Sequence, residues 1–513
     1  MQNAPFVRRR TILGAASLAA SVTGAALVAG CGADEPSTEA KTGGTLRAAF
    51  AGSGADEVLD PHRVNLFADA ARAKAMFDKL ADLGTDMAAV PRLAESWEAD
   101  PDLTVWTVKL RKATFHDGGP VRAADVLYSY RRIADPEETF RARSDLAPID
   151  LEASRAVDDT TVEFVLNYPL AEFPNALAAF GAYIVPEGAE DFTSPIGSGP
   201  FTFASFEPGR EFTAERFADY WDGPALLDRV QIVVADEESA RVNALLGGQV
   251  EYAHDLSATT ARANEGNDAV GLVASPGSNM LGFAMKTDRA PFDDVRVRQA
   301  MFLLADRAEL VESVLSGRGQ IGNDLFGLGF EHYADAIPQR EKDLEAAKAL
   351  FAEAGVETIT IDTADVGSGL VEAAQIFAEQ IRAAGVAVEL NERNADAYWS
   401  EVLTEGQIAS YRSGAMPIAS HISQRLLTDS PTNLTQWHHA DFDEQYLQLQ
   451  STADDADRQA LYDAIQQRLH DEGGYLVWGF ADWIIGTLPG VHGVEQAPAN
   501  TLEWARFDKV WMD

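Results

Sequence analysis

Hydrophobic and polar residues follow two periodicities along this chain, and each predicts a different kind of element. Residues 104–110 and 201–206 alternate apolar with polar side chains, which is typical of half-buried strands. Residues 123–133 instead repeat apolar side chains with the spacing of one helical face. Together these patterns predict an α/β fold. Further strands are expected at 44–50, 160–166, 211–214, 230–234, 475–480 and 483–487, and further helices at about 66–80, 239–246, 308–317, 343–354 and 461–469.

One stretch predicts parallel strand pairing. Strand-like residues 358–361 and 386–390 flank a helical pattern over about 370–384, which is the order of a βαβ unit with a right-handed crossover. Gly355 is expected to end the preceding helix in the left-handed conformation, and Gly247–Gly248 is expected to end helix 239–246 in the same way.

Two glycine-containing segments predict turns. Gly197 and Gly199 allow a tight turn that needs permissive φ angles, and Pro200 fixes the bend that follows. His116 and Asp117 precede a glycine, and Asp-Gly favours a tight hairpin turn. Since His116 and Asp117 could alternatively form an acid/base pair, both interpretations stay open at this point.

The chain is long and strongly acidic. Its 513 residues, 46% of them hydrophobic, suffice for two or three domains with a sizeable core. The formal net charge of −39 at pH 7 would repel nucleic-acid phosphates and anionic membrane surfaces. We therefore expect no nucleic-acid partner. The acidic composition favours solubility outside the cell, with steering of cationic ligands as the alternative.

Residues 1–30 have the organisation of an export signal. Arg8 to Arg10 precede the small and apolar run Gly14–Gly30, and this order describes a secretory signal peptide. A membrane-spanning helix is the alternative, for which the run is short and rich in alanine and glycine. The arginines before Thr11 also resemble a twin-arginine signal, so the Tat and Sec export routes both stay open.

Cys31 is the only cysteine, which excludes an intramolecular disulfide and a cysteine-based structural zinc site. It directly follows Val28, Ala29 and Gly30, and this box resembles a lipoprotein signal, in which the cysteine is lipidated and becomes the first mature residue. The resemblance predicts a lipid anchor on Cys31, an extracytoplasmic protein attached to the cell membrane, and a flexible tether over residues 31–43.

Three separate blocks carry specific motifs. Residues 194–254 contain Gly-Ser-Gly-Pro-Phe, Tyr-Trp-Asp-Gly-Pro, and a strand and helix that end in Ala-Leu-Leu-Gly-Gly-Gln-Val-Glu-Tyr-Ala. Residues 91–133 contain Phe-His-Asp-Gly, and residues 291–307 contain Pro-Phe-Asp-Asp-Val-Arg-Val-Arg-Gln-Ala followed by Ala-Asp-Arg. These blocks resemble the family 5 extracellular solute-binding proteins of bacterial ABC importers, the peptide- and nickel-binding class. The resemblance extends over much of residues 44–487.

The resemblance implies a two-lobed periplasmic-binding-protein fold of the Venus flytrap type, class II, with an extra inserted domain. A solute is expected to lie in the cleft between the lobes and to be enclosed by hinge closure. By analogy, lobe I comprises residues 44–77, 191–285 and 484–513, the inserted domain 78–190, and the opposing lobe 286–483.

The resemblance also implies that the protein captures a peptide-like or other small solute and delivers it to the permease of an ABC importer. We expect a monomer without catalytic residues, metal or cofactor. Two other classes stay open: a secreted enzyme that has kept the fold, and a sensor or chaperone lipoprotein. Turnover of peptides by the protein would favour the enzyme, whereas unchanged solute uptake after its loss would favour the sensor or chaperone.

Motifs of common catalytic sites are absent from the sequence. It contains no Gly-x-Ser-x-Gly nucleophile motif, no P-loop and no His-Glu-x-x-His zinc motif. Asp60 and His62 could contact a ligand, or Asp60 could cap a turn before Pro61. His438 and His439, with acidic residues nearby, could bind a metal or form a solvated segment.

One departure from the family pattern points to candidate ligand contacts. Peptide-binding members carry an aspartate in an Asp-Pro segment of the opposing lobe, where it pairs with the peptide's amine. Met416 stands at the corresponding position, and residues 406–428 contain no acidic residue but include Arg412. A buried ammonium without a carboxylate partner is costly, whereas an arginine binds a carboxylate or phosphate through a bidentate fork.

We therefore expect the ligand group that faces this segment to be neutral or anionic, with tryptophans as stacking surfaces. Alternatively, the segment is a solvent loop, and Asp396 or Glu401 binds an amine. The residues expected to border the ligand are Arg412, Tyr411, Met416, Trp399 and Trp437.

Overall fold

A long mixed sheet is the main element of the computed structural model, which describes residues 40–513 except 53 and 368. The predicted signal peptide, Cys31 and most of the tether lie outside the described residues. Residues 41–513 form one compact unit. Every helix in the described part of the chain is too short or too polar to cross a membrane.

The strands of the long sheet are β1 Thr45–Phe50, β8 Phe201–Glu207, β9 Glu211–Arg216, β10 Arg229–Val234, β11 Tyr252–Ala253, β12 Gly271–Met285, β13 Gly319–Ile321, β14 Thr358–Thr363, β15 Ala387–Glu392, β16 Ile408–Gly414 and β17 Tyr475–Thr487. Their order is β15-β14-β16-β12-β17-β11-β1-β10-β9-β8, and β13 pairs with β17. β1 runs parallel to β10 and β11, and β14 runs parallel to β15 and β16, whereas the other pairs are antiparallel.

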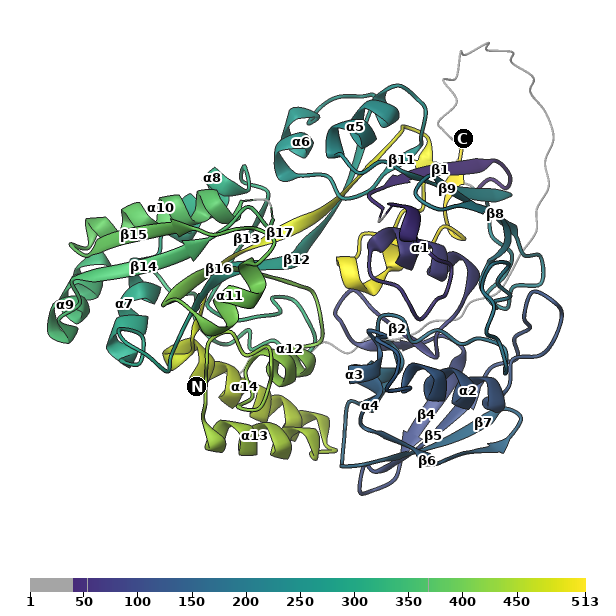
Figure 1. Cartoon of the computed structure of the whole chain (residues 1–513), viewed down its shortest axis with the longest axis horizontal. Helices are drawn as coiled ribbons and strands as arrows, with labels where there is room; N and C mark the ends of the chain where they lie inside the picture. Colours follow the sequence, from purple (N-terminus) through teal and green to yellow (C-terminus); the bar gives the residue numbers. More distant parts are fainter. Residues whose placement is uncertain (1–39, 53, 368) are drawn as a thin grey trace, which may run out of the picture. The chain divides into compact units, whose positions relative to one another are not determined.

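The two longest strands, β12 and β17, join the two parts of this sheet (Figure 1). Gly271–Ser275 pair with Trp483–Thr487, on the side where β17 also pairs with β11. Asn279–Met285 pair with β16 on the other side. A register shift separates Ser275 from Asn279. β12 and β17 therefore connect the β1, β8–β11 part of the sheet with the β14–β16 part.

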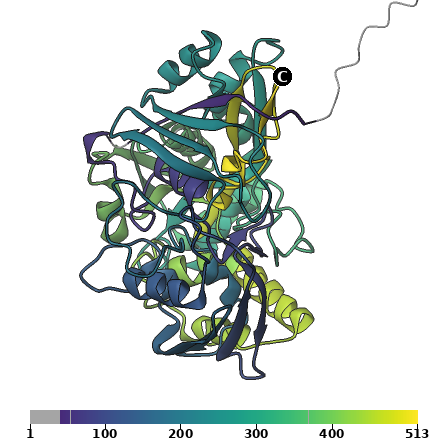
Figure 2. The same cartoon turned by 90° about the vertical axis from the view of Figure 1, so that its right-hand side faces the viewer.

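A second sheet lies in the segment between β1 and β8. It consists of β4 Ala94–Ala99, β5 Val105–Leu110, β7 Thr161–Leu166 and β6 Ile149–Asp158, in the order β4-β5-β7-β6. Helix α2, Ala123–Ile133, packs against it, and the ring of Tyr130 stacks on Phe164 at 5.6 Å between centroids. Both views show this sheet with α2 apart from the long sheet (Figures 1 and 2).

The remaining elements surround these two sheets. The short strands β2 and β3 pair with each other, as do β18 and β19. The bounds are β2 Ala81–Leu83, β3 Ala89–Pro91, β18 Val491–His492, β19 Trp511–Met512, α1 Phe67–Met76, α3 Arg143–Leu146, α4 Phe173–Leu177, α5 Glu238–Leu246, α6 Ala258–Ala263, α7 Val295–Leu304, α8 Arg307–Val314, α9 Leu344–Ala354, α10 Leu370–Ala383, α11 Tyr398–Thr404, α12 Ile418–Arg425, α13 Ala440–Gln450 and α14 Asp455–Glu472.

Local chemistry explains where several helices begin and end. Asp294, Asp306, Asp343 and Asp454 each accept a backbone N–H at the start of a helix, which satisfies a donor that has no partner within the helix. Gly355 ends α9 with a φ of 68°, as predicted. Helix α5 also ends at Gly247–Gly248 as predicted: its cap Gly247 has a φ of −81°, and Gly248 takes the left-handed conformation with a φ of 65°.

The sequence patterns located most elements but misjudged some lengths. The predicted βαβ unit is present as β14, α10 and the parallel strand β15. The two strands expected at 475–480 and 483–487 are one strand, β17, because Ala481 continues the pairing with Asn279. The helix expected at about 66–80 ends at Met76, where Phe77 becomes extended.

Gly197 and Gly199 are needed for a reason other than the predicted one. Neither has a positive φ. A Cβ at Gly197 would lie 1.9 Å from the carbonyl oxygen of Met76, and a Cβ at Gly199 would lie 2.5 Å from the carbonyl carbon of the same residue. The loop therefore approaches the end of α1 so closely that only glycine fits.

The apolar core is divided among the parts of the fold. One cluster lies between α1 and the β1, β8–β10 strands, and a second lies between α7–α10 and the β12, β14, β16 strands. A third fills the four-stranded domain and continues into α12–α14. The surfaces between these clusters are where a ligand site can form.

Candidate ligand-binding site

A cavity of about 510 Å³ lies beside the junction of the two parts of the long sheet. β12 and β17 line it with Asn279, Leu281 and residues 481–483. One side is lined by the segment before α1 and the loop after β11, and the other side by β16, α11 and the end of α8. The volume is within the usual range for small-molecule sites.

Arg412 and Trp399, both predicted from the sequence, line this cavity. Neighbouring residues of β16 point to opposite faces, so Arg412 is exposed while Tyr411 and Ser413 are buried. A Cβ at Gly367 would lie 3.0 Å from the guanidinium group of Arg412. Among the described residues, Arg412 has no hydrogen-bond or ion-pair partner, so its donors are open to an anionic group.

Tyr411 and Met416 lie near the cavity but outside its lining. Tyr411 is buried, stacks on Tyr475 at 5.0 Å, and meets the Trp399 ring edge-on at 6.2 Å. Tyr411 therefore packs against the ring of Trp399. Met416 lines an adjoining cavity of about 250 Å³, which also contains Arg425.

The prediction for Trp437 is corrected by its position. Its ring is completely buried between α13 and α14 side chains, with Phe442 edge-on at 6.0 Å and the Arg468 guanidinium at 5.7 Å. It lines neither cavity. Trp437 is a core residue, and it has no face available for stacking on a ligand in the cavity.

Arg141 connects the two cavities. Arg141, Phe180 and Asn500 line both of them, and the Arg141 guanidinium lies over the Phe180 ring at 4.3 Å. Burial raises the pKa of the Asp145 carboxyl group to about 6, although the positive charge of Arg141 acts in the opposite direction. The cavities thus form adjoining compartments with charged groups at their boundary.

Sequence reasoning missed the acidic residues of the larger cavity. Asp255 follows β11, and Asp482 is part of β17. Burial raises the pKa of both carboxyl groups, while Arg241 and Arg412 oppose the shift at Asp255 and Arg318 opposes it at Asp482. Asp255 directly follows a block that resembles the solute-binding family, but no local pattern marks it as a ligand residue.

The acids proposed as alternatives do not lie at this site. Glu401 is 3.6 Å from the guanidinium of Arg393, and Asp396 donates its backbone N–H to Asn394. Neither is among the residues that line the cavity. Among the described residues, Asp255 and Asp482 are the carboxylates that line the cavity and could bind an amine there.

Asp60 and His62 take part in a structural network. Asp60 accepts the backbone N–H of His62 and forms an ion pair with Arg132 at 2.6 Å. The His62 ring is buried, with Nε2 2.9 Å from the carbonyl oxygen of Tyr183. This arrangement agrees with the turn interpretation, because these groups have protein partners.

His116 and Asp117 belong to a turn rather than to an acid/base pair. His116 Nε2 lies 3.0 Å from the carbonyl oxygen of Gly199, and Nδ1 accepts the N–H of Gly197 at 3.2 Å. Burial lowers the pKa of His116 to about 4. The imidazole therefore ties this turn to the glycine loop, while Asp117 accepts the backbone N–H of Gly119.

His438 and His439 are not grouped with acidic residues in a metal-binding arrangement. His438 contacts Gln436 at 3.3 Å, and Asp441 pairs with Arg468 at 3.0 Å. Within the described part of the chain, the residues close enough to share a metal ion are Glu172, Glu331 and His332. Glu172 already accepts the Tyr462 hydroxyl at 2.7 Å and lies 3.2 Å from His332, so this cluster is an ionic contact.

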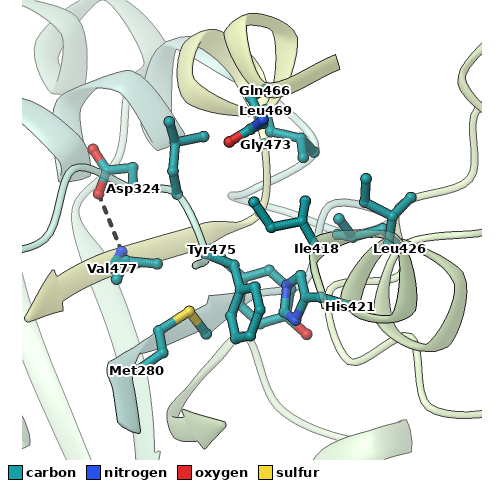
Figure 3. Close-up of a pocket in the computed structure, with 14 residues that line it drawn as sticks. Met280, Asp324, Ile418, His421, Leu426, Gln466, Leu469, Gly473, Tyr475 and Val477 are labelled. Carbon is teal, nitrogen blue, oxygen red and sulfur yellow. Dashed lines mark hydrogen bonds between the residues drawn. The ribbon is translucent and has the colours of Figure 1, made fainter. Parts of the chain in front are cut away.

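A further cavity lies under α12 and α14 (Figure 3). It is closed by Ile418, Leu426, Leu469 and other apolar side chains, with the His421 ring beside Tyr475 (Figure 3). Its volume of about 30 Å³ is comparable to that of one water molecule. It is therefore too small for a solute of the kind expected from the sequence.

The family profile described as bacterial extracellular solute-binding proteins, family 5, middle, matches residues 88–436. Since this match covers more than half of the chain, the chain belongs to this family of solute-binding proteins. The fold is the expected two-lobed periplasmic-binding-protein fold with an extra domain. The family comprises substrate-binding proteins rather than enzymes.

Relatives match over most of their length. The glutathione-binding protein GsiB of Pectobacterium atrosepticum is 27% identical over 457 residues, which are 83% of this chain and 85% of that protein. The di/tripeptide-binding protein 2 of Pseudomonas aeruginosa is 25% identical over 503 residues, 88% and 93% of the respective chains. The ABC transporter substrate-binding protein CtaP from Listeria monocytogenes has a similar structure, with a TM-score of 0.82 at 24% identity over 92% of this chain and 100% of that chain.

Proposed function

We propose that this protein is the substrate-binding component of an ABC importer that captures a small, peptide-like solute in the 510 Å³ cavity and delivers it to the permease. The observation that carries the proposal is Arg412, which is exposed in a cavity between the two parts of the sheet and has no partner among the described residues. An uncompensated guanidinium in such a place favours an anionic ligand group.

The ligand size is inferred from the cavity and from the relatives. A volume of about 510 Å³ accommodates a solute as large as a short peptide. Relatives named for binding glutathione and di- or tripeptides support a ligand of this size. The group that faces β16 is neutral or anionic, because Arg412 stands there and Met416 occupies the position expected for an acid.

Binding is proposed to close two lobes about a hinge. Lobe I comprises residues 44–77, 191–285 and 484–513, the inserted domain 78–190, and the opposing lobe 286–483. The register shift between Ser275 and Asn279 is a suitable place for the bend in β12, because ladder pairing is interrupted there. The cluster around Glu172 joins the inserted domain to the opposing lobe and would stabilise the closed form.

The protein is further proposed to act as a monomeric lipoprotein. After export by the Tat or the Sec route and removal of residues 1–30, Cys31 would carry the lipid. Residues 31–43 would then hold the binding domains away from the membrane, where they reach the permease. The sequence around Cys31 supports this arrangement.

Native mass spectrometry of the full-length protein as purified, followed by small-angle scattering, tests the proposed function. A copurified solute should be released on unfolding, and adding it back should lower the radius of gyration through hinge closure. Loss of uptake of that solute in cells without the protein would support delivery to a permease. An unchanged radius of gyration with confirmed binding, together with undiminished uptake, would contradict the proposal.

A further inference from the structure

Asp255 presents a carboxylate to the cavity from a backbone conformation that is uncommon for a residue with a side chain. Its φ is 55°, in the left-handed region that aspartate tolerates better than most residues. Within the described part of the chain, no group forms a hydrogen bond or ion pair with this carboxylate. Such conformations persist only where the surroundings enforce them, and they cluster at ligand sites.

Arg241 binds the backbone at Asp255 and, among the described residues, forms no ion pair with the Asp255 carboxylate. Its side chain is buried, and its donors point to the backbone. On the other side of Asp255, the N–H of Leu256 donates to the carbonyl oxygen of Ile484 at 2.9 Å. Four backbone carbonyl groups accept the hydrogen bonds of Arg241, at 2.7 to 3.0 Å: those of Ala235, Asp236, His254 and Asp255.

Arg412 lines the same cavity from the β16 side. Its positive charge opposes the upward shift that burial gives the pKa of the Asp255 carboxyl group. No ion pair joins them in the described structure, although both side chains are exposed to the cavity. The space between them can therefore be occupied by a solute that satisfies both charges.

Asp482 differs from Asp255 in its surroundings. The positive charge of Arg318 lowers the pKa of Asp482, again against the effect of burial, and the Arg318 guanidinium also lies 3.1 Å from Glu265. Asp482 also lies within strand β17 and is partly buried, whereas Asp255 lies in the loop after β11 and is the more exposed of the two. Asp255 is the carboxylate of this cavity whose nearest buried arginine is committed to backbone carbonyls.

Apolar side chains line the cavity near these charged groups. Phe67 and Leu281 contribute to the lining, and the Phe67 ring lies 4.9 Å from the ring of Trp483. Trp399, on the β16 side, is 37% exposed and offers an open aromatic surface. This arrangement suits an organic solute with charged ends and a partly apolar body, rather than a free inorganic ion.

We propose that the cavity binds a zwitterionic solute in one orientation, with its ammonium group on Asp255 and its carboxylate on Arg412. This inference rests on the proposed function and names the two groups that select the ligand. The orientation is opposite to the one that the family's Asp-Pro segment gives to peptides. Here the acid that binds the cation lies on the β11 side, and the arginine that binds the anion lies on the β16 side.

Titration calorimetry with four forms of trialanine tests this orientation: free at both ends, N-acetylated, C-amidated, and blocked at both ends. The full-length protein should bind the free form, and each block should weaken binding at least tenfold. Asp255→Asn should bind the free and acetylated forms equally, and Arg412→Gln should bind the free and amidated forms equally. Asparagine also tolerates the left-handed conformation, so the Asp255→Asn chain should fold and melt like the unmodified protein.

Asp482→Asn is the matched control within the cavity, and it should change the affinities for the free and acetylated forms by the same factor. The inference is overturned if acetylation has no effect, or if Asp255→Asn still discriminates against the acetylated form. It is also overturned if no form binds to the folded protein. In that last case, a solute found by native mass spectrometry would still support the proposed function. The absence of any such solute would contradict both the proposed function and this inference.

Discussion

His62 should make the stability of this protein sensitive to mild acid. Its imidazole is fully buried, and its Nε2 lies 2.9 Å from the carbonyl oxygen of Tyr183. Nδ1 faces the guanidinium of Arg132, which also pairs with Asp60. Burial lowers the pKa of His62 from 6.5 to about 4, the hydrogen bond to Tyr183 opposes this shift, and the charge of Arg132 adds to it.

The sign follows from proton uptake on unfolding. Between pH 6.5 and about 4, the unfolded chain binds a proton at His62 and the folded chain does not. The free energy of unfolding therefore keeps its full contribution from neutral His62 above pH 6.5 and loses it as the pH falls toward 4. For these two pKa values, lowering the pH from about 7.5 to about 5 costs roughly 2 kcal/mol of stability at this one site.

Replacing His62 with glutamine tests this value directly. The glutamine amide can donate to Tyr183 and accept from Arg132, but it does not titrate. Urea unfolding of both proteins, followed by tryptophan fluorescence, gives the difference in free energy from the midpoints and a shared slope. Between about pH 7.5 and about pH 5 this difference should move by roughly 2 kcal/mol in favour of glutamine.

All other groups titrate in both proteins, so the comparison isolates His62. His438→Gln, at an exposed histidine, controls for the loss of one imidazole. A His62→Gln difference that stays constant within about 0.5 kcal/mol across the range would refute the argument.

Three other changes probe the anchor, the glycine loop and the interdomain contact. Cys31→Ser should release the protein from membranes or leave it unprocessed, and fractionation with normal membrane retention would contradict the lipid anchor. Gly197→Ala should lower the free energy of unfolding by at least about 3 kcal/mol, because its Cβ would lie 1.9 Å from a carbonyl oxygen. As the control, Gly119→Ala meets only a flexible side chain and should lower the free energy of unfolding by less than about 1 kcal/mol. Equal urea midpoints for the two variants would contradict the packing argument. Glu172→Ala should raise the radius of gyration and weaken binding of the copurified solute about twofold to tenfold. Glu163→Ala, which removes the partly exposed pair with Arg155, should change neither, and unchanged scattering of Glu172→Ala would argue against a closing contact.

Amphipathic elements were the most predictable part of the fold. The helix predicted at 123–133 has the same bounds in the structure, because its apolar face alone determines where it packs. β12 was missed because it is central, mostly buried and interrupted by a register shift, so its residues do not alternate. For such a strand, the sequence pattern does not distinguish the two faces.

The candidate site was predictable only where the sequence departed from a known pattern. The absence of acidic residues around Arg412 predicted that Arg412 contacts the ligand, and Arg412 lines the cavity. Trp437 lies in the same part of the sequence but packs into the core, because neither position nor residue type determines the direction of a side chain. Asp255 carries no local signal, since its significance comes from Arg412 and Arg241, which only the tertiary structure brings near it.

The position of β17 has a consequence for biogenesis. In the sheet order, β11 and β12 are joined only through β17, which is synthesised near the end of the chain. On the ribosome, the sheet therefore remains in two separate pieces with unpaired edges until Tyr475–Thr487 has emerged. A nascent chain in this condition presents strand edges that can aggregate. As the last strand of the long sheet to be synthesised, β17 thus determines when the two pieces can join into one folded sheet.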